Sequence, residues 1–131
     1  MLEFVKRHIP ISLPYGDNSR YDLVAEFNGK LNRIQVKYCN CLTKENSVTL
    51  TCRSSTNHTT NKRLSTYKDD VDYMAFYIPS WEETLLIPIE EIGDKKSITI
   101  RRTLPKNNQS NVHQVSDFTF DKILGINAND L

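Results

Sequence analysis

Long apolar runs are missing from this sequence of 131 residues. A helix that crosses a membrane needs about 20 consecutive apolar residues, and no stretch approaches that length. The first residues also lack the basic start and the long apolar stretch of a secretion signal. We therefore expect a cytoplasmic protein that does not associate with a membrane.

Cysteine is also scarce, with three residues at positions 39, 41 and 52. Zinc sites pair their cysteines across gaps of about two to four residues, whereas Cys39 and Cys41 straddle one residue and no second pair follows. Positions two apart on a strand point to the same face, so both thiols can pack as small apolar groups. We expect reduced structural thiols rather than zinc ligands.

An excess of one charge sign is absent as well, because the net charge is +1. The charged fraction of 25% and the hydrophobic fraction of 38% are those of an ordinary soluble protein and exclude a disordered chain. The length fits one domain over residues 1–131 with a sizeable core.

One segment, residues 53–68, is locally basic and contains no acid. Its cations and polar side chains could neutralise phosphates and donate hydrogen bonds to them, although a solvated loop is the alternative interpretation. The candidate DNA contacts in it are Arg53, Ser55, Asn57, His58, Lys62 and Arg63. A second basic and polar segment, residues 101–109, is a weaker candidate of the same kind.

Strand patterns dominate the chain, and helix is limited to short segments. Residues 21–27 and 31–39 alternate between apolar and polar side chains on either side of Asn28-Gly29, a strong hairpin signal. Helical turns are expected before Pro10 and at residues 90–93, and residues 117–124 fit either a strand or a short helix. Further strands are expected at residues 48–52, 71–78, 85–89 and 97–101.

The hairpin brings three polar side chains together. If Asn28-Gly29 is a two-residue loop, Asp22 faces Gln35, and Lys37 shares that face of the next strand. Directly opposed side chains lie about 5 Å apart at Cβ. A carboxylate, an amide and an ammonium group would thus meet at the open end of the hairpin, with Val36 buried between the two polar positions.

These groups are typical of metal-assisted phosphate chemistry. Asp22, the Gln35 side-chain oxygen and the Val36 carbonyl can each supply a hard oxygen ligand to Mg²⁺. The metal would polarise a phosphate and lower the pKa of a water, and Lys37 could orient that water or stabilise the transition state. An ordinary exposed sheet face carries similar residues, so the geometry alone leaves both interpretations open.

Several sequence blocks resemble the PD-(D/E)XK endonucleases associated with group I introns. The first two are PYGDNSRYDL at residues 14–23 and LNRIQVK at residues 31–37, in which Gln35 stands where the motif usually has its second acid. The resemblance continues through residues 67–73, 86–91 and 105–109 and spans about residues 10–120. Several blocks in the same order are more specific than an isolated motif.

The resemblance implies an α/β (α+β) fold of the restriction-endonuclease type, with a mixed central sheet and flanking helices. It implies a homing-type endonuclease that cuts double-stranded DNA with Mg²⁺, or Mn²⁺ as a substitute, and leaves 5′-phosphate and 3′-hydroxyl ends. It also implies a homo-oligomer, a dimer or a tetramer, because two strands must be cut. Asp22, Gln35 and Lys37 take the catalytic positions.

The N-terminus departs from this family pattern. Relatives carry an N-terminal helix with a glutamate that completes the metal site, about two dozen residues before the motif aspartate, and counting back from Asp22 runs off the start of the sequence. Glu3 lies too close to Asp22 to be the obvious equivalent. We expect a shortened or missing helix, and the alternative function is a nuclease-derived module that binds nucleic acid or protein without cutting.

Two further groups of residues invite a functional interpretation. Asp69, Asp70 and Asp72 resemble metal ligands by composition, but their place before an apolar strand favours turn and capping roles. Trp81 fits a hairpin turn or an interface better than a platform for stacked bases.

Overall fold

The chain folds around two β-sheets, as seen in a computed structural model. The structure describes residues 2–16, 19–39, 42–44, 47–54, 65–67, 69–102 and 113–125, with the backbone alone at 42–44, 53–54, 65–66 and 113. The basic segment at 55–64 and the polar segment at 103–112 lie outside the described residues. The block of family resemblance at 105–109 falls in the second of these.

The central sheet has five strands in the order β1-β2-β3-β8-β9. Strands β3 and β8 run parallel, whereas the other neighbours are antiparallel, so the sheet is mixed as expected. The strands are β1 (Ile11–Ser12), β2 (Leu23–Phe27), β3 (Lys30–Tyr38), β8 (Tyr73–Ile78) and β9 (Glu83–Pro88).

The β2–β3 hairpin has the predicted turn and register. Asn28 and Gly29 have positive φ angles of 54° and 74°, the conformation that a two-residue turn of this type requires. Val24 pairs with Arg33 and Phe27 with Lys30, as the sequence predicts. The strand burial alternates, because the odd positions of β2 face a hydrophobic core.

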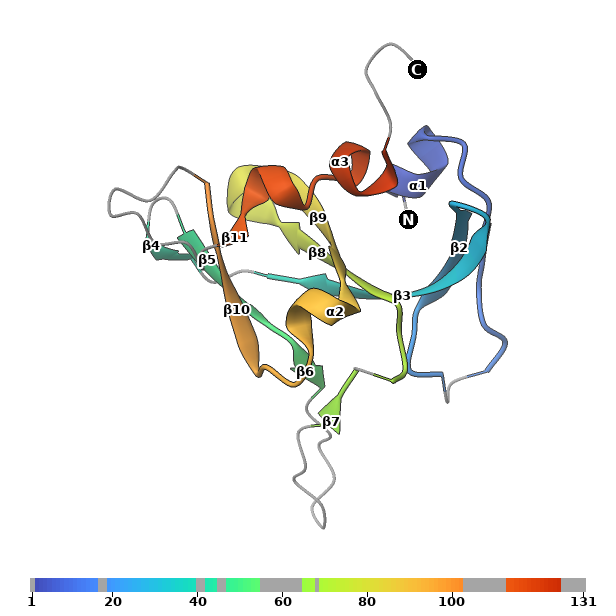
Figure 1. Ribbon diagram of the computed structural model, residues 1–131, viewed down its shortest axis with the longest axis horizontal. Coiled ribbons are helices and arrows are strands. Elements are labelled where there is room, and N and C mark those ends of the chain that lie inside the picture. The colour runs from blue at the N-terminus through green and yellow to red at the C-terminus, as the bar shows by residue number, and fades with distance from the viewer. Residues whose placement is uncertain are drawn as a thin grey trace.

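A second sheet has four strands in the order β11-β10-β5-β4. Its members are β4 (Leu42–Lys44), β5 (Ser47–Thr51), β10 (Ser97–Arg101) and β11 (His113–Gln114). A separate ribbon pairs β6 (Arg53–Ser54) with β7 (Ser65–Thr66), and it lies at the bottom of Figure 1, where β6 follows the lower end of β5. The ribbon therefore flanks the basic segment of residues 55–64.

The helices are short. They are α1 (Leu2–Lys6), α2 (Ile89–Ile92) and α3 (Phe120–Leu124), with 3-10 turns η1 (Pro79–Trp81) and η2 (Val115–Asp117). Helix α1 is brief, as expected, and the segment that fitted either strand or helix forms η2 and α3. Gly93 ends α2 as predicted. Within the described residues, no helix combines the length and the apolar character needed to cross a membrane.

Two hydrophobic cores lie on opposite faces of the central sheet. On one face, α1 and α3 pack beside the sheet (Figure 1). The centroid of the Phe4 ring lies 6.2 Å from that of Phe27 and 5.0 Å from that of Phe120. On the other face, Phe76 and neighbours pack against Leu50 and Ile100 of the second sheet. This second core brings β3 close to β5.

Several side chains of uncertain role are part of this packing. Cys39 and Cys52 are buried thiols that form no disulfide with another described residue, and Cys41 lies outside the described residues. Burial raises the pKa of Cys52 to about 11, which keeps the thiol protonated and unreactive near neutral pH. Trp81 lies in the turn between β8 and β9, as predicted, but it is buried in the core and not at an exposed interface.

Candidate active site

Asp22 is anchored to β3 through the backbone, immediately before β2 begins. Its N–H donates to the Ile34 carbonyl at 2.8 Å, and its carboxylate oxygen Oδ2 accepts from the Val36 N–H at 2.8 Å. The second oxygen, Oδ1, accepts no hydrogen bond from the described residues, and the side chain is exposed. The carboxylate is therefore held in place with one oxygen available for a ligand.

The Val36 carbonyl points to the same edge of β3. In a strand, the N–H and C=O of one residue point to the same side, and the Val36 N–H points to Asp22. Because β2 begins at Leu23, this part of β3 extends beyond its antiparallel partner. Two oxygen donors, one from the carboxylate and one from the backbone, thus lie at the open end of the hairpin.

The Val36 side chain is not buried, and this part of the prediction is wrong. It is 38% exposed, because the core under α1 and α3 reaches Ile34 and Ala75 but stops before Val36. Tyr38, on the same face, is 67% exposed, and the centroid of its ring lies 5.9 Å from that of the Tyr77 ring. The face behind the motif is therefore an open apolar surface.

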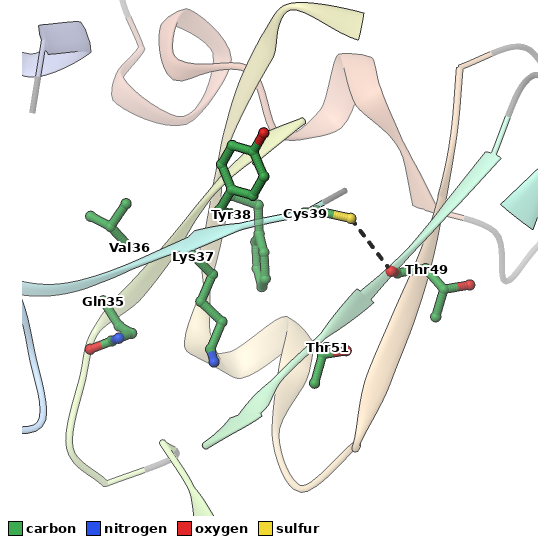
Figure 2. Close-up of a pocket in the computed structure, with 8 residues that line it drawn as sticks. Gln35, Val36, Lys37, Tyr38, Cys39, Thr49 and Thr51 are labelled. Atoms are coloured by element: carbon green, nitrogen blue, oxygen red, sulfur yellow. Dashed lines mark hydrogen bonds between the residues drawn. The ribbon is translucent and has the colours of Figure 1, made fainter. Parts of the chain in front are cut away.

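Gln35 and Lys37 point to the other face of β3, into a cavity of about 340 Å³. Figure 2 shows both side chains on one side of the strand and Val36 and Tyr38 on the other. The cavity is also lined by Thr49 and Thr51 of β5. Asp22 does not line the cavity and approaches the pair along the Val36 backbone, so the three predicted residues share the open hairpin end without lining one pocket.

Three residues of this region were missed from the sequence. Thr49 and Thr51 line the cavity, and they alternate along β5 with the buried Val48 and Leu50, a pattern that could have placed them on one face but not near Lys37. Tyr67 is buried, and its ring centroid lies 5.4 Å from the Lys37 ammonium nitrogen. No local pattern connects residues that are so far apart in sequence.

Two of the three acids before β8 form ion pairs, whereas turn and capping roles were predicted. Asp72 accepts hydrogen bonds from the Arg33 backbone N–H at 2.8 Å and from its guanidinium at 3.2 and 3.3 Å. Partial burial acts to raise the pKa of Asp72, but the hydrogen bonds from Arg33 outweigh it and hold the pKa below its ordinary value. Asp70 pairs with Arg20 at 3.5 Å. These pairs tie the start of β8 to the hairpin.

Glu3 is engaged within the helical layer. Its carboxylate accepts from Arg7 at 2.9 Å and from Lys6 at 3.4 Å, and Arg7 also donates to Asp121 of α3 at 2.9 Å. Burial acts to raise the pKa of Glu3, yet the bonds from Arg7 and Lys6 leave it lowered. In the part of the chain that the structure describes, no three His, Cys, Asp or Glu side chains gather as a metal cluster.

The predicted DNA contacts fall mainly outside the described residues. This holds for Ser55, Asn57, His58, Lys62 and Arg63, and the structure gives only the backbone of Arg53, in β6. In the second basic segment, the Arg102 guanidinium lies 5.6 Å from the centroid of the Trp81 ring, and Arg101 is half-buried. Contact between DNA and the basic segment around the β6–β7 ribbon therefore stays a prediction.

Comparisons with known proteins identify the family of the chain. A solved structure described as a bacterial homing endonuclease, I-Ssp6803I, is similar in fold, with a TM-score of 0.63 and 24% identity over 83% of this chain and 74% of that one. No curated protein sequence matches. A sequence model of the family described as PD-(D/E)XK endonuclease matches residues 1–121, which is most of the chain. The chain therefore belongs to the PD-(D/E)XK endonuclease family.

Proposed function

We propose that this protein is a Mg²⁺-dependent endonuclease of the homing type that hydrolyses phosphodiester bonds in double-stranded DNA. The observation that carries the proposal is the 2.8 Å hydrogen bond from the Val36 N–H to Asp22, because it fixes the motif carboxylate to the strand of Gln35 and Lys37. Family membership supports nuclease chemistry, and the homing endonuclease of similar fold supports the choice of substrate.

The donor set suits a hard cation. The free oxygen of Asp22 and the Val36 carbonyl would hold the ion, and the Gln35 side-chain oxygen would contribute from the next position along β3. One carboxylate and two neutral oxygens leave one of the two positive charges of the ion for the phosphate to neutralise. When bound, the ion supplies Lewis-acid stabilisation of the charge that develops on the phosphate.

Lys37 has the position of the motif lysine. Its ammonium group extends into the cavity beside Gln35, where it can hold an attacking water in line and stabilise the negative charge of the transition state. Thr49 and Thr51 form the opposite wall of the cavity, and the Thr49 hydroxyl pairs with that of Thr99 at 3.5 Å. The products would be a 5′-phosphate and a 3′-hydroxyl.

Binding to DNA would use the basic segment carried by the β6–β7 ribbon. Arg53 and the two cations Lys62 and Arg63 would neutralise phosphates, while Ser55, Asn57 and His58 would add hydrogen bonds. The ribbon follows β5, whose Thr49 and Thr51 line the cavity, so a duplex that contacts the ribbon could place a phosphate at the site. A homo-oligomer, a dimer or a tetramer, would supply a second site for the second strand.

The test is cleavage of a pool of supercoiled plasmids with random inserts, in Mg²⁺ or Mn²⁺. Ends that carry 5′-phosphates can be ligated to an adaptor and sequenced, which also identifies the target. We expect cutting that requires the metal and is lost in Lys37→Ala, by at least about 100-fold if the ammonium stabilises the transition state. The matched control is Lys30→Ala, which removes an exposed lysine at the other end of the same strand.

The second candidate function is a nuclease-derived module that binds DNA without cutting it. It is favoured by Gln35 in the position of an acid and by the ion pairs that engage Glu3, which leave Asp22 as the one carboxylate of the motif. Salt-dependent binding to plasmid by a folded protein, with no cutting in either metal, would establish this function and contradict the first.

A further inference from the structure

Tyr67 lies between the site and the β6–β7 ribbon. It follows β7 directly, and it is 6% exposed within the core that joins the two sheets. Two cations approach its ring: the Lys37 ammonium nitrogen lies 5.4 Å from the centroid, and the Arg20 guanidinium carbon lies 4.8 Å from it. Cations within about 6 Å of an aromatic centroid are attracted by the electron-rich face.

The ring is held by its own backbone. The Tyr67 carbonyl accepts from the N–H groups of Asp70 at 3.0 Å and Val71 at 3.1 Å, and the Val71 side chain is buried. The Asp70 carboxylate in turn pairs with Arg20 at 3.5 Å. Each of these contacts links the Tyr67 ring, Arg20 and the turn at Asp70 to one another. The ring therefore has little freedom to move.

Lys37, in contrast, has a long side chain. A lysine samples many rotamers in water and loses this side-chain entropy when it is fixed. A fixed aromatic face near the ammonium group limits where that group can lie before substrate arrives. Its contact also links Lys37 to the ribbon, because the ring belongs to the residue that follows β7.

We propose that Tyr67 is a positioning residue for Lys37, whose ring holds the ammonium group at the site and connects it to the ribbon that carries the candidate DNA contacts. The proposal rests on the nuclease function proposed above for its effect on cleavage. The contact between ring and lysine is independent of that function and can be measured without DNA.

The first experiment measures the contact by NMR. The ring current of Tyr67 shifts the resonances of the Lys37 side-chain methylenes, which can be assigned by comparison with Lys37→Arg. We expect the shift to persist in Tyr67→Phe, which keeps the ring, and to disappear in Tyr67→Leu. Tyr67→Met is the second apolar variant, since its flexible chain fills irregular volume if leucine leaves the core unstable. Lys37 resonances that are unchanged in both apolar variants would overturn the proposal.

The second experiment measures single-turnover cutting of a plasmid that the wild-type protein cleaves, over a range of protein concentrations. We expect Tyr67→Leu and Tyr67→Met to lower the maximal rate constant by about 3- to 30-fold, the range of a cation–π contact, and to leave the half-saturating concentration unchanged. Tyr67→Phe should cut within about twofold of wild type, since the ring face remains.

Two outcomes would overturn the positioning role. One is a wild-type rate in the apolar variants, and the other is an equal loss in Tyr67→Phe, which would assign the effect to the hydroxyl. If the wild-type protein cuts no plasmid, the nuclease function fails, and the NMR result still decides whether the ring holds the lysine.

Discussion

Among individual residues, Asp72 ties the start of β8 to the β2–β3 hairpin through Arg33. Asp72→Asn keeps the shape of the side chain but removes the charge that the guanidinium binds. Both side chains are more than a third exposed, so we expect a loss of about 1 kcal/mol in the free energy of unfolding at neutral pH. Urea denaturation measures the loss, and Asp69→Asn, at an exposed neighbour, is the control with little expected change.

The ionisation of Asp72 should also make the free energy of unfolding depend on pH. The folded-state pKa of Asp72 lies below its ordinary value of 3.8, so its stabilisation is complete above that value and is lost as the pH falls through the folded pKa. Asp72→Asn cannot be protonated in this way, so the stability difference between variant and wild type should shrink between about pH 7 and about pH 2.5. A difference that stays constant over this range would contradict the proposed role of the ionised carboxylate.

Among the elements, the β2–β3 hairpin depends on the conformation of its turn. Gly29 has a φ of 74°, and a Cβ added there would meet nothing within 4 Å, so the cost of a substitution is conformational and not steric. We expect Gly29→Ala to lower the free energy of unfolding by about 1 kcal/mol. Asn28→Gly is the control, because glycine accepts the φ of 54° there without strain. Equal losses in urea denaturation for the two variants would contradict this explanation.

An element could be predicted from the sequence when the residues that specify it are close together in the chain. The turn at Asn28-Gly29 specifies the register of the hairpin by itself, and with it the relation of Asp22, Gln35 and Lys37. Strands such as β1, β6, β7 and β11 have two residues each, too few to show an alternating pattern. They exist because a neighbouring strand offers hydrogen bonds, and a sequence read locally does not reveal that neighbour.

At the scale of the whole molecule, the site lies where the two sheets separate. The parallel pairing of β3 with β8 and the packing of β5 across from them form the cavity that Lys37 enters. Thr49 and Thr51 could not be assigned to this cavity from the sequence, nor Tyr67 to Lys37, because these positions depend on contacts between distant segments. The burial of Val36 was predicted wrongly for a related reason: alternation identifies the face of a strand but not how far the helices cover it.

The number of sites in one chain bears on its assembly. One chain of 15.2 kDa carries one copy of the Asp22, Gln35 and Lys37 set, so a cut through both strands in one binding event requires a second copy. We expect sedimentation to give at least twice the mass of one chain at working concentrations. Cleavage should then convert supercoiled plasmid to the linear form with little nicked intermediate, because both sites act before the complex dissociates. A monomeric protein that accumulates nicked plasmid before any linear product would show that each strand is cut in a separate encounter, and would contradict the homo-oligomer.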